Sequence, residues 1–201
     1  MNRFSLPRRL SLRTWIGIGL ATLSLTVFFP GCAAKVFTWN EEVQLDGGQV
    51  IVVRRTISFK EYQPLGGGGG GSDILDSTLA IESPGIAGAP DKWSNPPLIP
   101  MILDRDKQTN EWFIVTTFYM CTAWYDLGRP KLPYAEFRYR QGQWVRQPLS
   151  DHLIGRQANL LVPNQRDVTG DHTLSSKHQI MSDPTMSSRH KLVVSTWRTN
   201  C

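Results

Sequence analysis

Residues 37–53 of this chain read FTWNEEVQLDGGQVIVV. The apolar side chains of its first half occupy alternate positions, at Phe37, Trp39, Val43 and Leu45. A period of two is typical of a strand that buries one face and exposes the other. The Asp-Gly-Gly-Gln segment at 46–49 supplies residues that readily adopt positive φ, and a second apolar run, Val50–Val53, follows it. The stretch therefore predicts a β-hairpin.

Two more hairpins are predicted further along the chain. One joins Leu98–Leu103 to Trp112–Tyr119, and the other joins Tyr134–Arg140 to Trp144–Gln147 through a Gln-Gly-Gln turn. Helical periodicity is weak, apart from one turn near 151–156. Shorter candidate strands are Thr78–Glu82, Asn159–Val162 and Lys191–Trp197. The sequence thus predicts a mainly β fold, a small antiparallel β-sheet domain (sandwich or open barrel) built from hairpins with long irregular loops.

Three segments between these strands are predicted to be irregular. The six consecutive glycines at 66–71 would lose too much backbone entropy in a packed element, so a Gly-rich loop is expected there. A phosphate-binding loop would need a strand before it, a helix after it and usually a Lys, and this context is not evident. Five prolines make 84–100 irregular, and the polar stretch 163–190 is expected to be a long surface excursion.

Charge is unevenly placed along the chain. It carries 22 Lys and Arg against 17 Asp and Glu, a formal net charge of +5, but residues 1–31 hold four of the Arg and no acidic residue. Without those four, 18 basic side chains face 17 acidic ones, so residues 32–201 are nearly neutral. This balance argues against a nucleic-acid partner, because phosphate binding depends on clustered Lys and Arg. With 40% hydrophobic residues the chain is also too apolar to be disordered.

Residues 1–31 are predicted to be a lipoprotein signal peptide. A charged segment, Met1–Arg13, precedes the uncharged run Trp15–Phe29, which as a helix would reach about 22 Å, short of the roughly 30 Å membrane core. Gly31 and Cys32 then resemble the lipobox of bacterial lipoproteins. This resemblance implies a diacylglycerol on Cys32 and cleavage just before it, and Ala33 in place of Asp favours outer-membrane sorting. The alternative is a plain signal peptide or a short anchor with an incidental Cys.

Lipidation of Cys32 would leave an even pair of cysteines, Cys121 and Cys201. In an oxidising compartment this pair is expected to form a disulfide, which would close a loop of about 80 residues and contribute roughly 4 kcal/mol in the chain-entropy model. Two unrelated thiols are the alternative. The predicted organisation is a signal peptide, a β domain, and a polar loop with a terminal strand tied to that domain, at residues 1–31, 32–163 and 164–201.

Two blocks of sequence carry a resemblance to a known family. The first is Trp39–Arg55, and the second is Trp124–Tyr134 together with Phe137–Tyr139 and Gln143-Trp144. They resemble a family of uncharacterised proteobacterial proteins, many of which are predicted lipoproteins or secreted proteins. Members place a Cys a few residues before the Gly-Arg-Pro segment of the second block, as Cys121 is placed here. The family implies no known activity and no catalytic residues.

Residues that could carry chemistry are few. The four histidines lie in the last quarter of the chain at spacings that match no established metal site, so they are expected in solvated loops, with no metal or other cofactor. They are His152, His172, His178 and His190. No Gly-x-Ser-x-Gly segment marks a nucleophilic Ser. The chain is therefore expected not to be an enzyme, and an envelope hydrolase that uses the His- and Asp-rich C-terminal region is the less favoured alternative.

Aromatic and Arg side chains concentrate between residues 112 and 146, where they could form a binding surface, because Trp, Tyr and Arg dominate binding hot spots. The candidates are Trp112, Trp124, Tyr125, Arg129, Tyr134, Arg138 and Trp144. The alternative is that they fill the core of a small β domain.

The sequence as a whole predicts a lipid-anchored protein on the periplasmic face of the bacterial envelope, at the outer membrane. Its expected role is structural or protein-binding, with the membrane and an envelope protein as partners. The alternative functions are a peptidoglycan- or glycan-binding module and a hydrolase inhibitor, since exposed aromatic rings also suit sugar rings.

Overall fold

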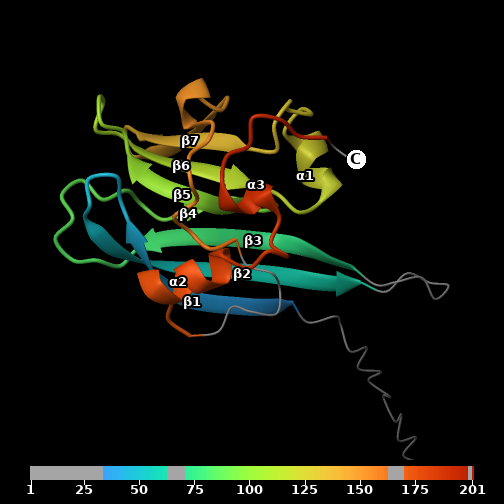
Figure 1. The fold of residues 1–201 in the computed structure, drawn as a ribbon, viewed down its shortest axis with the longest axis horizontal. Helices are drawn as coiled ribbons and strands as arrows, with labels where there is room; N and C mark the ends of the chain where they lie inside the picture. The colour runs from blue at the N-terminus through green and yellow to red at the C-terminus, as the bar shows by residue number, and fades with distance from the viewer. Residues whose placement is uncertain (1–33, 63–70, 163–169, 199–200) are drawn as a thin grey trace, which may run out of the picture. The chain divides into compact units, whose positions relative to one another are not determined.

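The computed structural model describes residues 34–62, 71–162, 170–198 and 201. The predicted signal peptide, Cys32 and the Gly-rich loop up to residue 70 lie outside these residues. Within the described part, two antiparallel sheets of four strands each make up most of the regular structure (Figure 1). The predicted fold class, a mainly β domain built from antiparallel hairpins, is confirmed.

The first sheet has the strand order β1-β2-β3-β4. Its strands are β1 (Lys35–Gln44), β2 (Val50–Tyr62), β3 (Gly71–Ile81) and β4 (Trp93–Ser94). The β1–β2 hairpin is the one predicted from the opening stretch, and its turn holds Gly48 at a φ of 82°. The predicted strand Thr78–Glu82 is the second half of the longer β3.

Side chains of the first sheet alternate between a buried and an exposed face. On β1, Val43 is buried and its neighbour Gln44 is exposed, and on β2, Val53 is buried and Arg54 is exposed. The alternation arises because one face packs on the second sheet while the other faces solvent. We call the solvent-facing side, which carries Arg54, the outer face of the first sheet.

The second sheet has the strand order β5-β6-β7-β8. Its strands are β5 (Ile99–Arg105), β6 (Trp112–Thr117), β7 (Ala135–Arg140) and β8 (Gln143–Gln147). Both remaining predicted hairpins, β5–β6 and β7–β8, are confirmed. The β7–β8 turn has two central residues with positive φ, Gln141 at 50° and Gly142 at 79°, as a two-residue type I′ turn requires.

Both faces of the second sheet are buried. Ile114 faces the first sheet and packs in one cluster with Val43 and Leu79, whereas the adjacent Val115 points the other way. There it packs with Leu153 and Val193, which belong to the C-terminal part of the chain. All six residues of β6 are therefore buried, and β6 reads as a continuous apolar run instead of an alternating one.

The C-terminal part differs from the prediction. The predicted strands Asn159–Val162 and Lys191–Trp197 do not form, and the second segment contributes only one isolated bridge, from Leu192 to Gln157. The described residues form four short helices where only one turn, near 151–156, was predicted: α1 (Cys121–Asp126), η1 (Asp151–Leu153), α2 (Leu174–Met181) and α3 (Ser188–Lys191). The predicted terminal strand is thus wrong. The helices were not predicted because short polar helices lack the apolar stripe that reveals helical periodicity.

A buried cluster of charges holds α2 against β1. The carboxylate of Glu41 lies 2.8 Å from an Arg55 guanidinium nitrogen and 2.9 Å from Lys177 Nζ, and all three side chains are almost completely buried. Lys177 comes from α2 and also donates to the carbonyl oxygens of Glu42 and Asn159. Burial alone would raise the pKa of Glu41, but the two cations beside it hold that pKa below its usual value.

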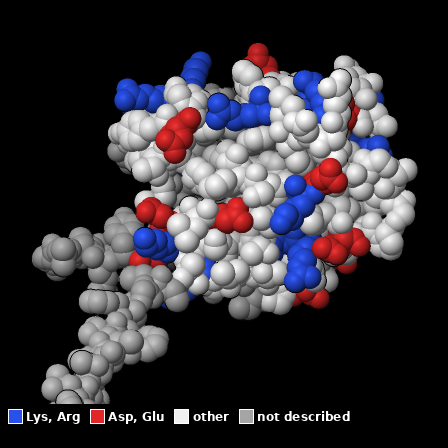
Figure 2. Space-filling model, turned by 180° about the vertical axis from the view of Figure 1, so that it is seen from behind, with Lys and Arg blue, Asp and Glu red and all other residues white. Residues whose placement is uncertain are grey.

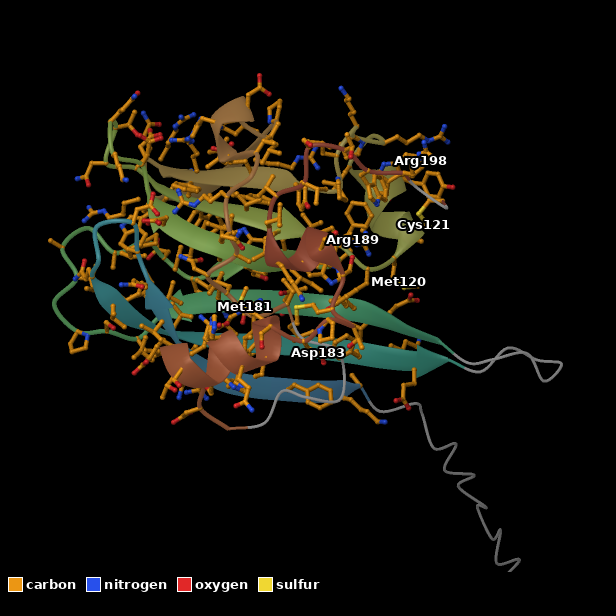
Figure 3. The ribbon with its side chains drawn as sticks, in the orientation of Figure 1. Met120, Cys121, Met181, Asp183, Arg189 and Arg198 are labelled. Carbon is orange, nitrogen blue, oxygen red and sulfur yellow. A yellow bond between two sulfur atoms is a disulfide. The ribbon has the colours of Figure 1, made fainter. Side chains whose placement is uncertain are left out.

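The predicted disulfide between Cys121 and Cys201 is present, with Cα atoms 5.4 Å apart (Figure 3). It joins the end of the described chain to the first residue of α1. The Tyr125 hydroxyl donates to the Cys201 carbonyl at 2.6 Å, and the Trp197 ring packs edge-on against Phe118 and Trp124. These contacts fix the C-terminal segment beside α1 without a strand.

The described surface carries charges of both signs. Figure 2 shows Lys and Arg interspersed with Asp and Glu over the face that it presents, with an uncharged hollow between them. In the described part of the chain, no helix has the length and apolar character needed to cross a membrane.

Candidate functional site

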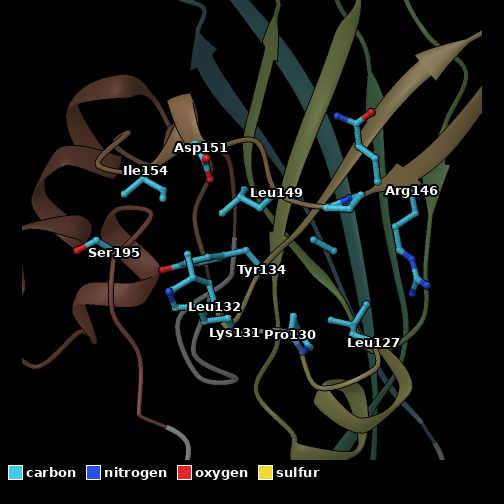
Figure 4. A pocket seen from close by; sticks show the side chains of 13 residues that line it. Leu127, Pro130, Lys131, Leu132, Tyr134, Arg146, Leu149, Asp151, Ile154 and Ser195 are labelled. Atoms are coloured by element: carbon cyan, nitrogen blue, oxygen red, sulfur yellow. The ribbon is translucent and has the colours of Figure 1, made fainter.

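A cavity of about 530 Å³ opens where the β7–β8 hairpin ends (Figure 4). Its walls come from four segments: the α1–β7 connection, the end of β8, the turn around η1, and the C-terminal segment at Ser195. We call it the β8 groove. It is lined by Leu127, Pro130, Lys131, Leu132, Tyr134, Ala135, Arg146, Gln147, Pro148, Leu149, Asp151, Ile154 and Ser195.

The β8 groove combines apolar side chains with cations that lack a partner. Leu132, Leu149 and Ile154 provide apolar surface, and Ile154 is 37% exposed. Lys131 and Arg146 are exposed and form no salt bridge or side-chain hydrogen bond with any described residue. Asp151, on the η1 side, is the single acidic residue among the lining residues. The lining therefore suits a ligand with both apolar and anionic groups.

The α1–β7 connection is positioned by the way α1 ends. Gly128 follows the helix at a φ of 82° and donates its N–H to the Tyr125 carbonyl, while the Arg129 N–H reaches the Trp124 carbonyl. This pair of bonds is a Schellman motif. The Trp124 indole N–H then donates to the Pro130 carbonyl at 3.1 Å, which fixes the start of the groove wall.

Arg129 occupies a strained backbone conformation. Its φ is 58°, in the left-handed region that favours Gly, and it precedes a Pro. Its guanidinium lies 5.1 Å from the centre of the Tyr125 ring and 6.0 Å from that of Trp124. Trp124, Tyr125 and Arg129, three residues of the predicted binding surface, are therefore brought together close in sequence to the groove-lining Leu127 and Pro130, and Tyr125 is 44% exposed.

Three residues of the predicted binding surface are buried, so that part of the prediction is wrong. Trp112 lies in the core and donates its indole N–H to the Gly88 carbonyl at 2.8 Å. Arg138 is held by two carboxylates, those of Glu136 and Asp106, each at 2.7 Å. Both side chains are buried because the second sheet is covered on both faces, which the local sequence does not reveal.

Tyr134 is buried as well, and its hydroxyl anchors the C-terminal segment. That hydroxyl lies 3.0 Å from the Leu192 carbonyl and accepts the Val194 N–H at 3.0 Å. Burial raises the pKa of the Tyr134 phenol, so the group stays protonated at neutral pH. Its ring forms the floor of the β8 groove.

Trp144 lies away from the groove. It packs on Tyr139 with ring centres 5.3 Å apart, and its indole N–H donates to the Asp91 carbonyl at 2.8 Å. The predicted surface is therefore not continuous.

Two of the four histidines are buried, contrary to the expectation of solvated loops. His172 and His190 are each 8% exposed, whereas His152 and His178 are exposed as expected. Burial, together with the neighbouring Arg189, lowers the pKa of His190 to about 4. Among the described residues, no three His, Cys, Asp or Glu side chains come together as metal ligands would.

Sequence reasoning missed most of the groove lining, including Lys131, Leu132, Arg146 and Leu149. The available signal was the set of prolines at 130, 133 and 148, which end the regular structure on either side of the β7–β8 hairpin. The cavity itself depends on the turn around η1 and on Ser195, which are distant in sequence from the hairpin.

Comparison of the chain with protein-family models, with curated proteins and with solved structures gives no match in any of the three. The fold and the groove define a two-sheet antiparallel β domain with a ligand-sized cavity beside an edge strand.

Proposed function

We propose that this chain is a lipid-anchored protein of the bacterial envelope whose β domain binds a protein partner at the β8 groove. The groove supports partner binding because the exposed Ile154 and the half-buried Leu132 and Leu149 lie next to two cations, Lys131 and Arg146, that pair with no described residue. Exposed apolar side chains with charged neighbours are typical of interaction sites. The combination of groove and edge strand is the observation that carries the proposal.

The proposed anchor is a diacylglycerol on Cys32, on the periplasmic face of the outer membrane. The charged segment, the short uncharged run and Gly31-Cys32 support it, as does the resemblance to proteobacterial predicted lipoproteins. Two or more acyl chains would hold the domain stably at the membrane. Cys32→Ser should abolish labelling by a clickable palmitate analogue, and equal labelling of both proteins would contradict the anchor.

The partner can be sought by photo-crosslinking in intact cells. A photoreactive amino acid at position 149, inside the groove, should give a discrete cross-linked protein. The matched control places the same amino acid at Arg54, which is exposed on the outer face of the first sheet. The same product from both positions, or none from position 149, would contradict partner binding at the groove.

A second candidate function, glycan binding, is favoured by one observation. Tyr125 is 44% exposed, and its ring centre lies 5.1 Å from that of Trp124. The two neighbouring rings offer a surface for stacking on sugar rings. Arg129 covers part of this platform, which makes the glycan role the weaker one. Sedimentation with purified peptidoglycan, reduced by Tyr125→Ala but unaffected by Leu149→Ala, would favour it over protein binding.

A further inference from the structure

The outward edge of β8 is open among the described residues. β8 pairs with β7 on one side, and no described strand or loop backbone is hydrogen-bonded to its other side. Arg140 and Gln143 close the two-residue turn, so they exchange both of their backbone hydrogen bonds. Counting along the ladder from this pair, the N–H and C=O groups of Trp144 and Arg146 point away from β7.

The β8 groove begins where this open edge ends. Arg146 belongs to both features, since its backbone faces outward and its side chain lines the groove. Lys131 contributes a second cation from the α1–β7 connection (Figure 4). A second hollow, of about 600 Å³, lies beside the turn at the other end of β8 and is lined by Gln143 and Val145. Accessible space therefore borders both ends of β8.

Resting on the proposed partner binding, we propose that the partner contributes an extended acidic segment that adds to β8 as a fifth strand of the second sheet. Its backbone would bond to the outward groups of Trp144 and Arg146, as in other strand-addition complexes. Its carboxylates would pair with Arg146 and Lys131, and an apolar side chain would enter the groove beside Leu149.

Charge selects the acidic segment over other extended segments. The groove lining holds two cations that pair with no described residue, Lys131 and Arg146, and a single acidic residue, Asp151. The exposed Arg129 directly precedes the lining residue Pro130 in sequence. A basic segment would face repulsion from these cations. A competing explanation for the exposed Arg146 is that its charge prevents other chains from pairing with the open edge of β8, as charged residues on edge strands often do.

The test uses the full-length chain purified in detergent and a fluorescein-labelled nonapeptide of alternating Val and Glu. Fluorescence anisotropy should show binding of this peptide and no binding of a nonapeptide of alternating Val and Lys. Raising the salt concentration to about 0.5 M should weaken the binding of the Val–Glu peptide. A Val–Glu peptide with alternate backbone nitrogens methylated should bind poorly, because it cannot complete the strand ladder.

Variants of the chain separate the side-chain and backbone contributions. Arg146→Ala and Lys131→Ala should each weaken binding about tenfold, the usual effect of losing a hydrogen bond between charged groups. Arg146→Pro should weaken it further, since Pro also removes the outward N–H while leaving the β7 ladder intact. Arg54→Ala, an exposed Arg on the outer face of the first sheet, is the matched control and should bind like the wild type. Thermal melting of each variant checks that it folds.

Several results would overturn strand addition. The first is equal binding of the Val–Glu and Val–Lys peptides, and the second is equal binding of the methylated and unmethylated Val–Glu peptides. The third is self-association of Arg146→Ala while the wild type binds neither peptide, which is the result expected if Arg146 only protects the edge of the sheet. Binding of phosphatidylglycerol vesicles through Arg146 and Lys131, without peptide binding, would assign these cations to a lipid surface. If the cross-link from position 149 persists in any of these cases, partner binding stands and only the acidic strand is excluded.

Discussion

Glu41→Gln should destabilise the β domain strongly, although Glu41 is far from the β8 groove. Its carboxylate accepts from Arg55 at 2.8 Å and from the Leu161 N–H at 2.9 Å, and it pairs with Lys177 at 2.9 Å. The substitution keeps the size of the side chain and removes the charge. Arg55 and Lys177 would then remain buried without a counter-ion.

The size of the expected destabilisation follows from the burial of these charges. Removing one partner of a buried charge cluster costs about 3–5 kcal/mol, because the remaining charges stay desolvated. Arg55 and Lys177 keep carbonyl partners, such as Leu161 and Glu42, which places the expected loss at the lower end of this range. For a domain of this size, about 3 kcal/mol corresponds to a melting temperature lower by roughly 10 °C.

Chemical denaturation followed by tryptophan fluorescence measures the effect. Glu61→Gln is the matched control, since Glu61 pairs with Lys35 on the surface, where both side chains are more than half exposed. An exposed pair contributes less than about 1 kcal/mol, so this variant should unfold almost like the wild type. Lys177→Met combined with Glu41→Gln should cost less than the sum of the two single substitutions.

Lowering the pH should cause the same loss of folding stability as Glu41→Gln. The pKa of Glu41 is held below its ordinary value of 4.5, so its contribution is complete above pH 4.5 and disappears as pH falls through the lower folded-state pKa. A loss of stability in Glu41→Gln no larger than that in Glu61→Gln, or strict additivity of the substitutions at Glu41 and Lys177, would contradict this role of the buried charges.

Three further predictions concern other parts of the domain. Because His190 has a pKa of about 4 when folded and an ordinary value of 6.5, stability should fall by up to about 3 kcal/mol between pH 6.5 and pH 4, and His190→Gln should flatten this part of a pH series of urea melts. Cys201→Ser should lower the unfolding free energy by about 2–4 kcal/mol and leave it insensitive to reductant, whereas an unchanged midpoint would mean that the disulfide does not support the C-terminal segment. Arg129→Gly should raise the melting temperature by relieving about 1 kcal/mol of backbone strain, while Arg129→Ala, which keeps the strain, should not.

The three hairpins were predictable because their signals are local. In two of them, apolar runs flank the turn segments Asp-Gly-Gly-Gln and Gln-Gly-Gln. In the third, two apolar runs flank the polar segment 104–110. The Cys121–Cys201 pairing was also within reach, since only two cysteines remain once Cys32 is set aside. Each of these inferences needs residue types and spacing and no knowledge of distant contacts.

The tertiary structure alone decided which side chains are available for binding. Trp112, Tyr134 and Arg138 have the residue types of a binding surface, but packing buries all three. Trp112 lies in the core that faces the first sheet, Arg138 is enclosed by Glu136 and Asp106, and Tyr134 lies beneath the C-terminal segment. The same segment completes the β8 groove by bringing Ser195 to a wall made 60 residues earlier in the chain. Burial and cavities arise from packing between elements that are remote in sequence, so no local sequence pattern predicts them.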